Sequence, residues 1–552
     1  MPSALRPIAV VAEELGIPAE HVVPYGRDKA KIDLAALAGA PRRAGRLVLV
    51  SAIEPAGGGE GKTTISVALA MALRRLGRRT ALCLREPSLG PVFGIKGGGT
   101  GGGAAQVEPA ADINLHFTGD LHAVTAAHNL LAALVDGELH FGGTTGLDPR
   151  RIHFPRVLDV NDRALRHVLV GLGGPGHGMP REARFVITAA SEVMACLCLA
   201  ESIDDLRVRL GRIVVGERKD GSFVRASDVG GVDAMLALLR DALSPNLVQT
   251  REGGPALVHG GPFANVAHGC SSVVATRLGL AYADDVVTEA GFGFDLGGEK
   301  FLHLKCRGAG LFPRVVVLVC TARAFTAHGG GSFERGLHHL DRQIANVGRF
   351  GLPCVVAINV FDGDSESELS AIEARARSHG VRVERCTGFR HGSEGAIELG
   401  RTVADVLAGT DAHPPAPRFL YPLEASLETK IRTVVTAIDG ASDVAFTERA
   451  KARLAQLEAN GAGTLPVCIA KTPLSFSDDP RAGGLAEGFV PTVTGLELSA
   501  GAGFVVARMG EIELLPGLPR KPAALRVRVD DDGTIHGLMQ GEGGAEPRGP
   551  TR

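Results

Sequence analysis

A glycine-rich segment at residues 56–64 constrains this chain more than any other feature. The segment reads Ala-Gly-Gly-Gly-Glu-Gly-Lys-Thr-Thr. An apolar run at residues 47–50 precedes it, and apolar residues at helical spacing follow it between Ile65 and Leu76. A buried strand, a glycine-rich loop ending in Gly-Lys-Thr and a helix form the order of a phosphate-binding loop. We therefore predict an α/β fold in which this loop binds a nucleotide.

The chemistry of such a loop assigns a role to each part of it. Backbone N–H groups and the N-terminus of the following helix attract phosphate, so Lys62 would reach the outer phosphates and Thr63 would offer its hydroxyl to Mg²⁺. The usual first glycine of the pattern is replaced here by Ala56. The alternative is a tight strand-to-helix turn that binds nothing. The predicted nucleotide-binding residues are Ala56, Gly57, Gly58, Gly59, Glu60, Gly61, Lys62, Thr63 and Thr64.

Length and strand spacing predict several domains. A chain of 552 residues exceeds one hydrophobic core. Short apolar runs alternate with helical patterns, which is typical of a doubly wound sheet. We predict a large P-loop NTPase-like doubly wound domain over residues 1–350, a smaller α/β domain over 351–418 and a C-terminal α+β domain over 419–552. The predicted strands are residues 47–50, 80–84, 113–117, 315–320, 354–359 and 381–385.

The composition argues against several classes of protein. Lys and Arg number 59 against 61 Asp and Glu, so no excess of positive charge points to a nucleic-acid partner. No apolar run reaches the ~18–20 residues of a membrane span, and the N-terminus lacks a signal-peptide pattern. The nine cysteines are scattered without a Cys-x-x-Cys pair, which indicates neither a disulfide framework nor a zinc site. We expect a cytoplasmic protein with no membrane partner.

Other polar segments follow predicted strands. Arg85 follows the run at 80–84, where ligands of open α/β sheets bind, so it is predicted to hold an anion beside the phosphates. The alternative role of Arg85 is an ion pair with Glu86 or another carboxylate. The glycine run at 97–103 is a second anion-binding nest, a lid or a surface loop.

Three further groups of residues leave their role open. Residues 289–300 carry acids and a lysine framed by glycines, which suits Mg²⁺, a monovalent cation or phosphate, or else a solvated turn. His116 and His122 are weak candidates for proton handling, and a structural role is the alternative. Phe361 and Phe389 follow predicted strands, where they would sandwich a flat heterocycle or cap the local core.

With these residues in view, the chain resembles the formate–tetrahydrofolate ligase family, also called formyltetrahydrofolate synthetases. The resemblance covers nearly the whole chain, and it depends on several long sequence motifs that occur in the same order. They include Glu-Gly-Lys-Thr-Thr at 60–64, Leu-Arg-Glu-Pro-Ser-Leu-Gly-Pro at 84–91, Asp-Ile-Asn-Leu-His-Phe-Thr-Gly-Asp at 112–120, and His-Gly-Gly-Pro-Phe-Ala-Asn at 259–265.

The resemblance implies a reaction and a set of roles. In that family formate, ATP and tetrahydrofolate give 10-formyltetrahydrofolate, ADP and phosphate through formyl phosphate, as a step of one-carbon metabolism. It implies that Lys62 and Thr63 hold ATP and Mg²⁺, that Arg85 stabilises formyl phosphate, and that Phe361 and Phe389 contact the pterin. It also implies a homotetramer activated by a monovalent cation.

The chain departs from the family pattern at the loop. The family usually has Thr-Pro-Ala-Gly where residues 56–59 stand, and losing the proline raises the ordering cost of the loop by up to ~1 kcal/mol. We predict weaker ATP binding without loss of chemistry. Phenylalanine at 389, in place of a tryptophan, puts folate affinity in question.

Three alternatives to this ligase remain open. The first is another P-loop enzyme that activates a carboxylate or carbamate through a mixed phosphate anhydride. The second is a regulatory P-loop ATPase whose nucleotide state controls a protein partner. The third is a family member whose catalysis is impaired by the altered loop.

Overall fold

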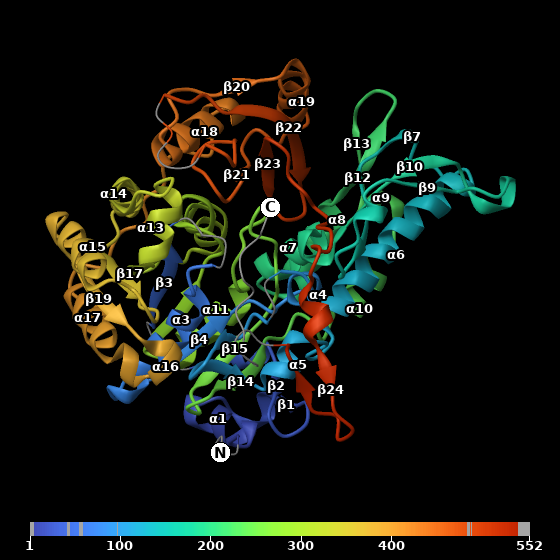
Figure 1. The fold of residues 1–552 in the computed structure, drawn as a ribbon. Coiled ribbons are helices and arrows are strands. Elements are labelled where there is room, and N and C mark those ends of the chain that lie inside the picture. The colour runs from blue at the N-terminus through green and yellow to red at the C-terminus, as the bar shows by residue number, and fades with distance from the viewer. Residues whose placement is uncertain are drawn as a thin grey trace.

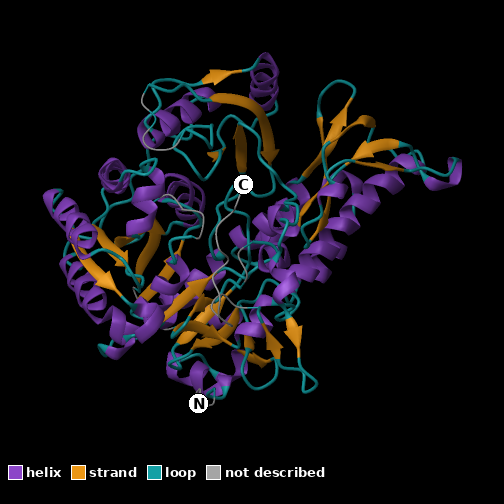
Figure 2. Cartoon of the chain, in the orientation of Figure 1, coloured by secondary structure: helices purple, strands orange, loops and turns teal. Residues whose placement is uncertain are grey.

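A computed structural model describes residues 5–40, 45–53, 59–95, 98–482, 486 and 488–538. Its centre is one large mixed sheet, with the strand order β1-β2-β14-β15-β4-β16-β3-β17-β18-β19 and with β5 and β6 attached through β14 (Figures 1 and 2). The central strands are β15 (Pro255–Val258), β4 (Thr80–Leu84), β16 (Asp285–Glu289), β3 (Arg46–Ala52), β17 (Val315–Cys320), β18 (Cys354–Asn359) and β19 (Arg382–Cys386). The edge strands are β1 (Val22–Pro24), β2 (Ala30–Ile32), β14 (Asn246–Thr250), β5 (Gly101–Gly102) and β6 (Ala105–Glu108).

The seven central strands run parallel, and the edge formed by β1, β2 and β14 is antiparallel. The α/β class predicted from sequence is confirmed, with a mixed rather than wholly parallel sheet. Strands β18 and β19 continue the same sheet beyond β17. The domain boundaries stay a prediction.

Alternate residues of the central strands pack into two different cores, because successive side chains of a strand point to opposite faces. Val48 and Val50 belong to one core, with helix α3 (Lys62–Arg75) and helix α17 (Ile397–Gly409). Leu47 and Leu49 belong to the other, with α11 (Val273–Tyr282), α14 (Phe333–Arg349) and α15 (Glu366–Ser378). A sheet covered on both faces explains why these strands read as continuous apolar runs.

One predicted strand is wrong. The run at 113–117 lies partly in the short helix α5 (Ala110–Asn114) and partly in the turn after it, where Phe117 has a φ of 46°. The buried Asn114 side chain donates to the carbonyl of Ala110 and to the hydroxyl of Thr100. These local side-chain hydrogen bonds favour a helical turn over the backbone pairing of a strand.

Two further parts of the chain surround the central sheet (Figure 1). An arm extends to the right in the figure, and the C-terminal region lies above the sheet. The arm comprises α6 (Asp120–His140), the three-stranded sheet of β7 (Leu147–Ile152), β12 (Val214–Arg218) and β13 (Phe223–Arg225), the hairpin of β9 (Val168–Val170) and β10 (Arg181–Ala183), and helices α7 (Glu192–Leu199), α8 (Ile203–Arg212) and α10 (Val232–Leu239). The C-terminal region comprises α18 (Leu427–Val434), α19 (Glu448–Ala459) and the sheet of β20 (Ala445–Phe446), β22 (Thr492–Ser499), β23 (Phe504–Met509) and β21 (Val467–Ala470).

In the described part of the chain, no helix combines the length and the hydropathy that a membrane crossing requires. The arm and the C-terminal region share a buried apolar core, which includes Ile213 of the arm and Phe504 of β23, and polar contacts also join them. The Glu192 carboxylate, on α7, accepts a hydrogen bond of 2.7 Å from the backbone N–H of Gly501, beside β22.

Burial raises the pKa of Glu192 to about 7, against an unfolded value near 4.5. A carboxyl group with a raised pKa favours folding while it is protonated, so its contribution is lost as the pH rises from 4.5 through 7. We expect this to cost the wild type roughly 1–3 kcal/mol between pH 5 and 8.

The Glu192→Gln variant, which keeps an acceptor oxygen but cannot ionise, should lack that loss. Thermal unfolding midpoints at pH 5 and pH 8 check this, with Glu448→Gln at an exposed position as the control. An equal pH dependence in wild type and Glu192→Gln would contradict the assignment.

Candidate active site

The predicted ligand-binding residues follow strands that end at one edge of the sheet. Lys62 comes after β3, Arg85 after β4, and Phe361 and Phe389 after β18 and β19. All four strands are parallel, so their carboxyl ends share an edge. Ligands of open α/β sheets bind beyond this edge.

The described part of the glycine-rich loop leads directly into α3. Ala56, Gly57 and Gly58 lie outside the described residues. Gly59 and Gly61 have φ values of 74° and 72°, a region that favours glycine. A Cβ on Gly61 would lie 2.4 Å from Nδ2 of Asn359, so this position has no room for a side chain. Lys62 is the first residue of α3, and Thr63 and Thr64 follow in its first turn.

Glu60 ties the loop to the ends of two strands. Its carboxylate accepts a hydrogen bond of 2.8 Å from Thr321, which follows β17. Its backbone carbonyl accepts one of 3.0 Å from the Asn359 side chain, at the end of β18. The side chain of Glu60 is buried. These bonds fix the last turn of the loop, so Glu60 serves the loop's conformation.

Glu289 is a site residue whose role the sequence analysis did not assign. It ends β16, which lies between β3 and β4. The Thr63 hydroxyl donates to its carboxylate at 3.0 and 3.2 Å. In P-loop NTPases the loop hydroxyl and an acid on a neighbouring strand hold Mg²⁺ together. The sequence shows an acid at the end of an apolar run, but it does not show that this acid contacts Thr63.

Lys62 and Arg85 lie close enough for the charge of Arg85 to affect Lys62. Burial lowers the pKa of Lys62, and the charges of Glu289 and Glu60 oppose that effect, while the charge of Arg85 adds to it. Two cations close enough to disfavour each other form a place where an anion is strongly stabilised.

Arg85 is held by a loop that follows β15. Its guanidinium donates to the carbonyl of Pro262 at 3.2 Å. A Cβ on Gly291 would lie 3.3 Å from Nη2 of Arg85. Both residues are described, and no ion pair joins Arg85 to Glu86, which was the alternative reading of this arginine. Most of the guanidinium donors therefore stay available for an anion.

Glu86 lies deeper, and one of its carboxylate oxygens has no hydrogen-bond partner within the described residues. Burial raises its pKa well above the usual range; Asp120 and Asp159 raise it further and Lys31 opposes them. A buried carboxylate with an unused oxygen and acidic neighbours suits a bound cation.

The two phenylalanines occupy different surroundings. The Arg323 guanidinium lies 3.8 Å from the ring centroid of the half-buried Phe361. Phe389 is 42% exposed, so it does not cap a core. Its backbone carbonyl accepts a hydrogen bond of 2.8 Å from Ala104, and its ring lies beside Gly102, where a Cβ would meet it at 3.0 Å.

Part of the glycine run therefore lies beside the ring of Phe389. Gly101 and Gly102 form β5 next to Phe389, and Gly97 lies outside the described residues. A role of this run in anion binding stays a prediction.

The structure gives His128 a structural role but assigns no role to His116 and His122. His128, on α6, stacks on Phe154 at 4.1 Å and bonds Ser191 and the carbonyl of Pro155, and burial lowers its pKa to about 4. It is structural. His116 and His122 form no hydrogen bond to Lys62 or Arg85 in the described structure, and their proton-handling role stays a prediction.

The fold and this edge define an α/β protein in which a glycine-rich loop, an arginine and two aromatic residues follow the carboxyl ends of parallel strands. A family model described as "Formate–tetrahydrofolate ligase" matches residues 2–539. The chain is 58% identical over 549 residues to the formate–tetrahydrofolate ligase of Myxococcus xanthus (strain DK1622), covering 98% of this chain and 100% of that one. It is 54% identical to that of Paracoccus denitrificans (strain Pd 1222), covering 97% and 98% of the two chains. The chain belongs to the formate–tetrahydrofolate ligase family.

Proposed function

We propose that this protein ligates formate to tetrahydrofolate with ATP, giving 10-formyltetrahydrofolate, ADP and phosphate in one-carbon metabolism. The observation that carries the proposal is the placement of Lys62, Arg85 and two aromatic residues at one sheet edge of a chain from this family. The regulatory-ATPase alternative has no comparable support, because the family match spans nearly the whole chain. The test is formation of 10-formyltetrahydrofolate that requires all three substrates.

The reaction takes two steps in this proposal. A formate oxygen attacks the γ-phosphorus of ATP, the bond to the β–γ bridging oxygen breaks, and ADP leaves. N10 of tetrahydrofolate then attacks the formyl carbon, loses its proton, and phosphate leaves. Lys62 stabilises the outer phosphates and Arg85 the formyl phosphate, since phosphoryl transfer depends mainly on positioning and charge stabilisation.

Two cations fit the residues present. Thr63 and Glu289 would hold Mg²⁺, which when bound neutralises charge on the β- and γ-phosphates. The unused oxygen of Glu86 fits the monovalent cation. Because Glu86 adjoins Arg85 in the chain, a cation there would fix the backbone that carries the arginine.

The aromatic pair is proposed to hold the pterin. Phe361→Ala should raise the KM for tetrahydrofolate by about tenfold or more, since stacking on one aromatic side chain contributes ~1–3 kcal/mol. The KM values for ATP and formate should stay unchanged, and Phe389→Trp should lower that for tetrahydrofolate. Steady-state kinetics check this, with Leu238→Ala at an exposed position of α10 as the control. A KM for tetrahydrofolate that does not change in Phe361→Ala would remove the ring from this role.

We also propose a cytoplasmic homotetramer. The arm exposes Phe141 (85%), Leu169 (68%) and Leu172 (61%), and apolar surface of this kind often takes part in protein interfaces. Light scattering of the purified protein measures its mass directly. The weaker ATP binding expected from the altered loop stays a prediction, because most of the changed residues lie outside the described structure.

A further inference from the structure

A cavity is lined by residues other than those of the proposed active site. Its volume is about 800 Å³, within the range of small-molecule sites. One wall comes from the arm, through β7, β12 and the β9–β10 hairpin, and the other from the C-terminal region, through α19, β22 and β23. We call it the arm cleft. None of Lys62, Arg85, Phe361 and Phe389 lines it.

The charged lining of the arm cleft has an excess of arginine. Four glutamates oppose six arginines, and no lysine or aspartate is among the lining residues. Apolar side chains, including Val186, Val214 and Phe504, lie between them. The arginines are Arg150, Arg181, Arg184, Arg449, Arg453 and Arg508, and the glutamates are Glu182, Glu192, Glu217 and Glu497.

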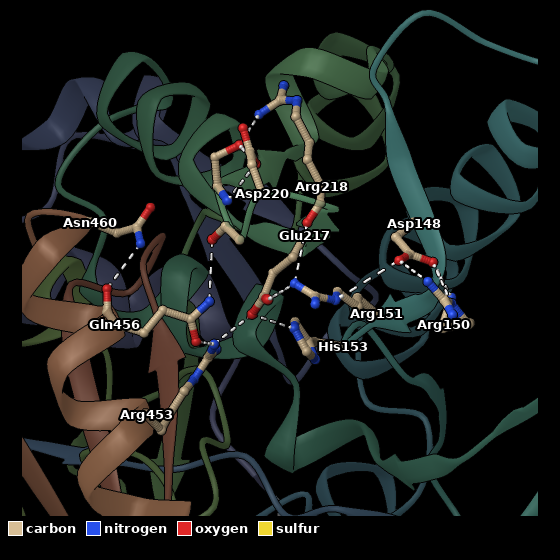
Figure 3. Close-up of polar contacts among 12 residues, drawn as sticks. Asp148, Arg150, Arg151, His153, Glu217, Arg218, Asp220, Arg453, Gln456 and Asn460 are labelled. Atoms are coloured by element: carbon tan, nitrogen blue, oxygen red, sulfur yellow. Dashed lines mark hydrogen bonds and ion pairs between the residues drawn. The ribbon is translucent and has the colours of Figure 1, made fainter.

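Glu217 is a built-in counterion on the arm side (Figure 3). Its carboxylate pairs with Arg453 of α19 at 2.5 Å, with His153 at 2.8 Å and with Arg151 at 3.7 Å. Burial alone raises the pKa of Glu217, but hydrogen bonds from Gln456, His153 and Arg453 hold it below the usual range. This carboxylate therefore stays charged, and its contact with Arg453 joins the two walls.

Glu497 is a second, looser counterion on the C-terminal wall. Arg184 and Arg508 approach it only to 3.5 and 3.4 Å, and neither contact forms a hydrogen bond. The buried Nε of Arg508 has no hydrogen-bond partner among the described residues. Arg449, exposed on α19, has no ion pair or hydrogen bond within the same part of the chain. Three guanidinium groups thus keep unused donors facing one cavity.

We propose that the arm cleft binds a small organic anion that carries at least two carboxylate or phosphate groups. Arg184, Arg508 and Arg449 supply the donors, because guanidinium groups pair bidentately with both kinds of anion. The apolar side chains between them contact the carbon skeleton. Glu497 competes with the ligand for the same arginines.

Calorimetric titration of the full chain with tricarballylate, and separately with pyrophosphate, tests this site. The titrations use the Lys62→Ala background, so that binding at the nucleotide loop is not mistaken for binding in the cleft. We expect one saturable site whose affinity falls with salt. Arg449→Ala should weaken binding at least about fivefold, since it removes a charged hydrogen-bond donor that is partly solvated.

Glu497→Gln separates a ligand site from a structural ion-pair cluster. Removing the competing carboxylate should tighten anion binding by about threefold or more, whereas a purely structural cluster would lose stability and gain no affinity. The control is Arg349→Ala, an exposed helical arginine outside the cleft. Competition by tetrahydrofolate would identify its own carboxylates as the ligand, and lack of competition a separate anion. No saturable binding below ~10 mM, or equal affinities in the Lys62→Ala parent and in its Arg449→Ala and Glu497→Gln derivatives, would overturn the proposal.

Discussion

Replacing Arg85 with alanine is expected to lower kcat for 10-formyltetrahydrofolate formation by about a thousandfold. Removing one group that stabilises transition-state charge typically costs 10²–10³, and removing an arginine at a transferring phosphoryl group costs 10³–10⁵. The electrostatics support this size, because the charge of Arg85 lowers the pKa of Lys62 and no ion pair occupies the Arg85 guanidinium in the described structure.

The same variant distinguishes chemistry from nucleotide binding. Affinity for ATP should change little, since Lys62 and the loop remain. Arg85→Lys should recover only part of the rate, because an ammonium cannot form the planar bidentate contact. The exposed Arg401→Ala serves as the control. Unchanged turnover in Arg85→Ala would remove this residue from the mechanism.

Replacing Glu289 with glutamine is expected to lower kcat by about a hundredfold and to raise the Mg²⁺ concentration needed for half-maximal rate. Glutamine retains an oxygen for the Thr63 hydroxyl but loses the charge that helps hold the ion. Activity measured across a Mg²⁺ titration checks both effects.

A matched pair at position 63 completes this test. Thr63→Ser keeps the hydroxyl and should retain activity, whereas Thr63→Val keeps the shape and should resemble Glu289→Gln. A Mg²⁺ dependence unaffected by Glu289→Gln and Thr63→Val would contradict a shared metal site.

The sequence predicted the parts of this site that depend on local order. A strand, a glycine loop and a helix predicted the positions of Lys62 and Thr63, and predicted strands end before Arg85, Phe361 and Phe389. The two phenylalanines were expected in a separate small domain, whereas β18 and β19 continue the central sheet and bring them to the same edge. These predictions needed only the rule that ligands bind beyond the carboxyl ends of parallel strands.

Other parts depend on pairings that no local pattern reveals. Glu289 contacts Thr63 across 226 residues, and only the insertion of β16 between β3 and β4 brings them together. The arm cleft joins the arm and the C-terminal region in the same way. The run at 113–117 was predicted as a strand because it is apolar and short, but the side-chain bonds of Asn114 favour a helical turn there.

The central claim is that formate is activated as formyl phosphate between Lys62 and Arg85. Formate labelled with ¹⁸O in both oxygens tests it, because the oxygen that attacks ATP must leave with phosphate when the folate amine takes the formyl group. Mass spectrometry of the phosphate released during turnover should show one ¹⁸O per molecule. Phosphate without label, formed together with 10-formyltetrahydrofolate, would contradict the account.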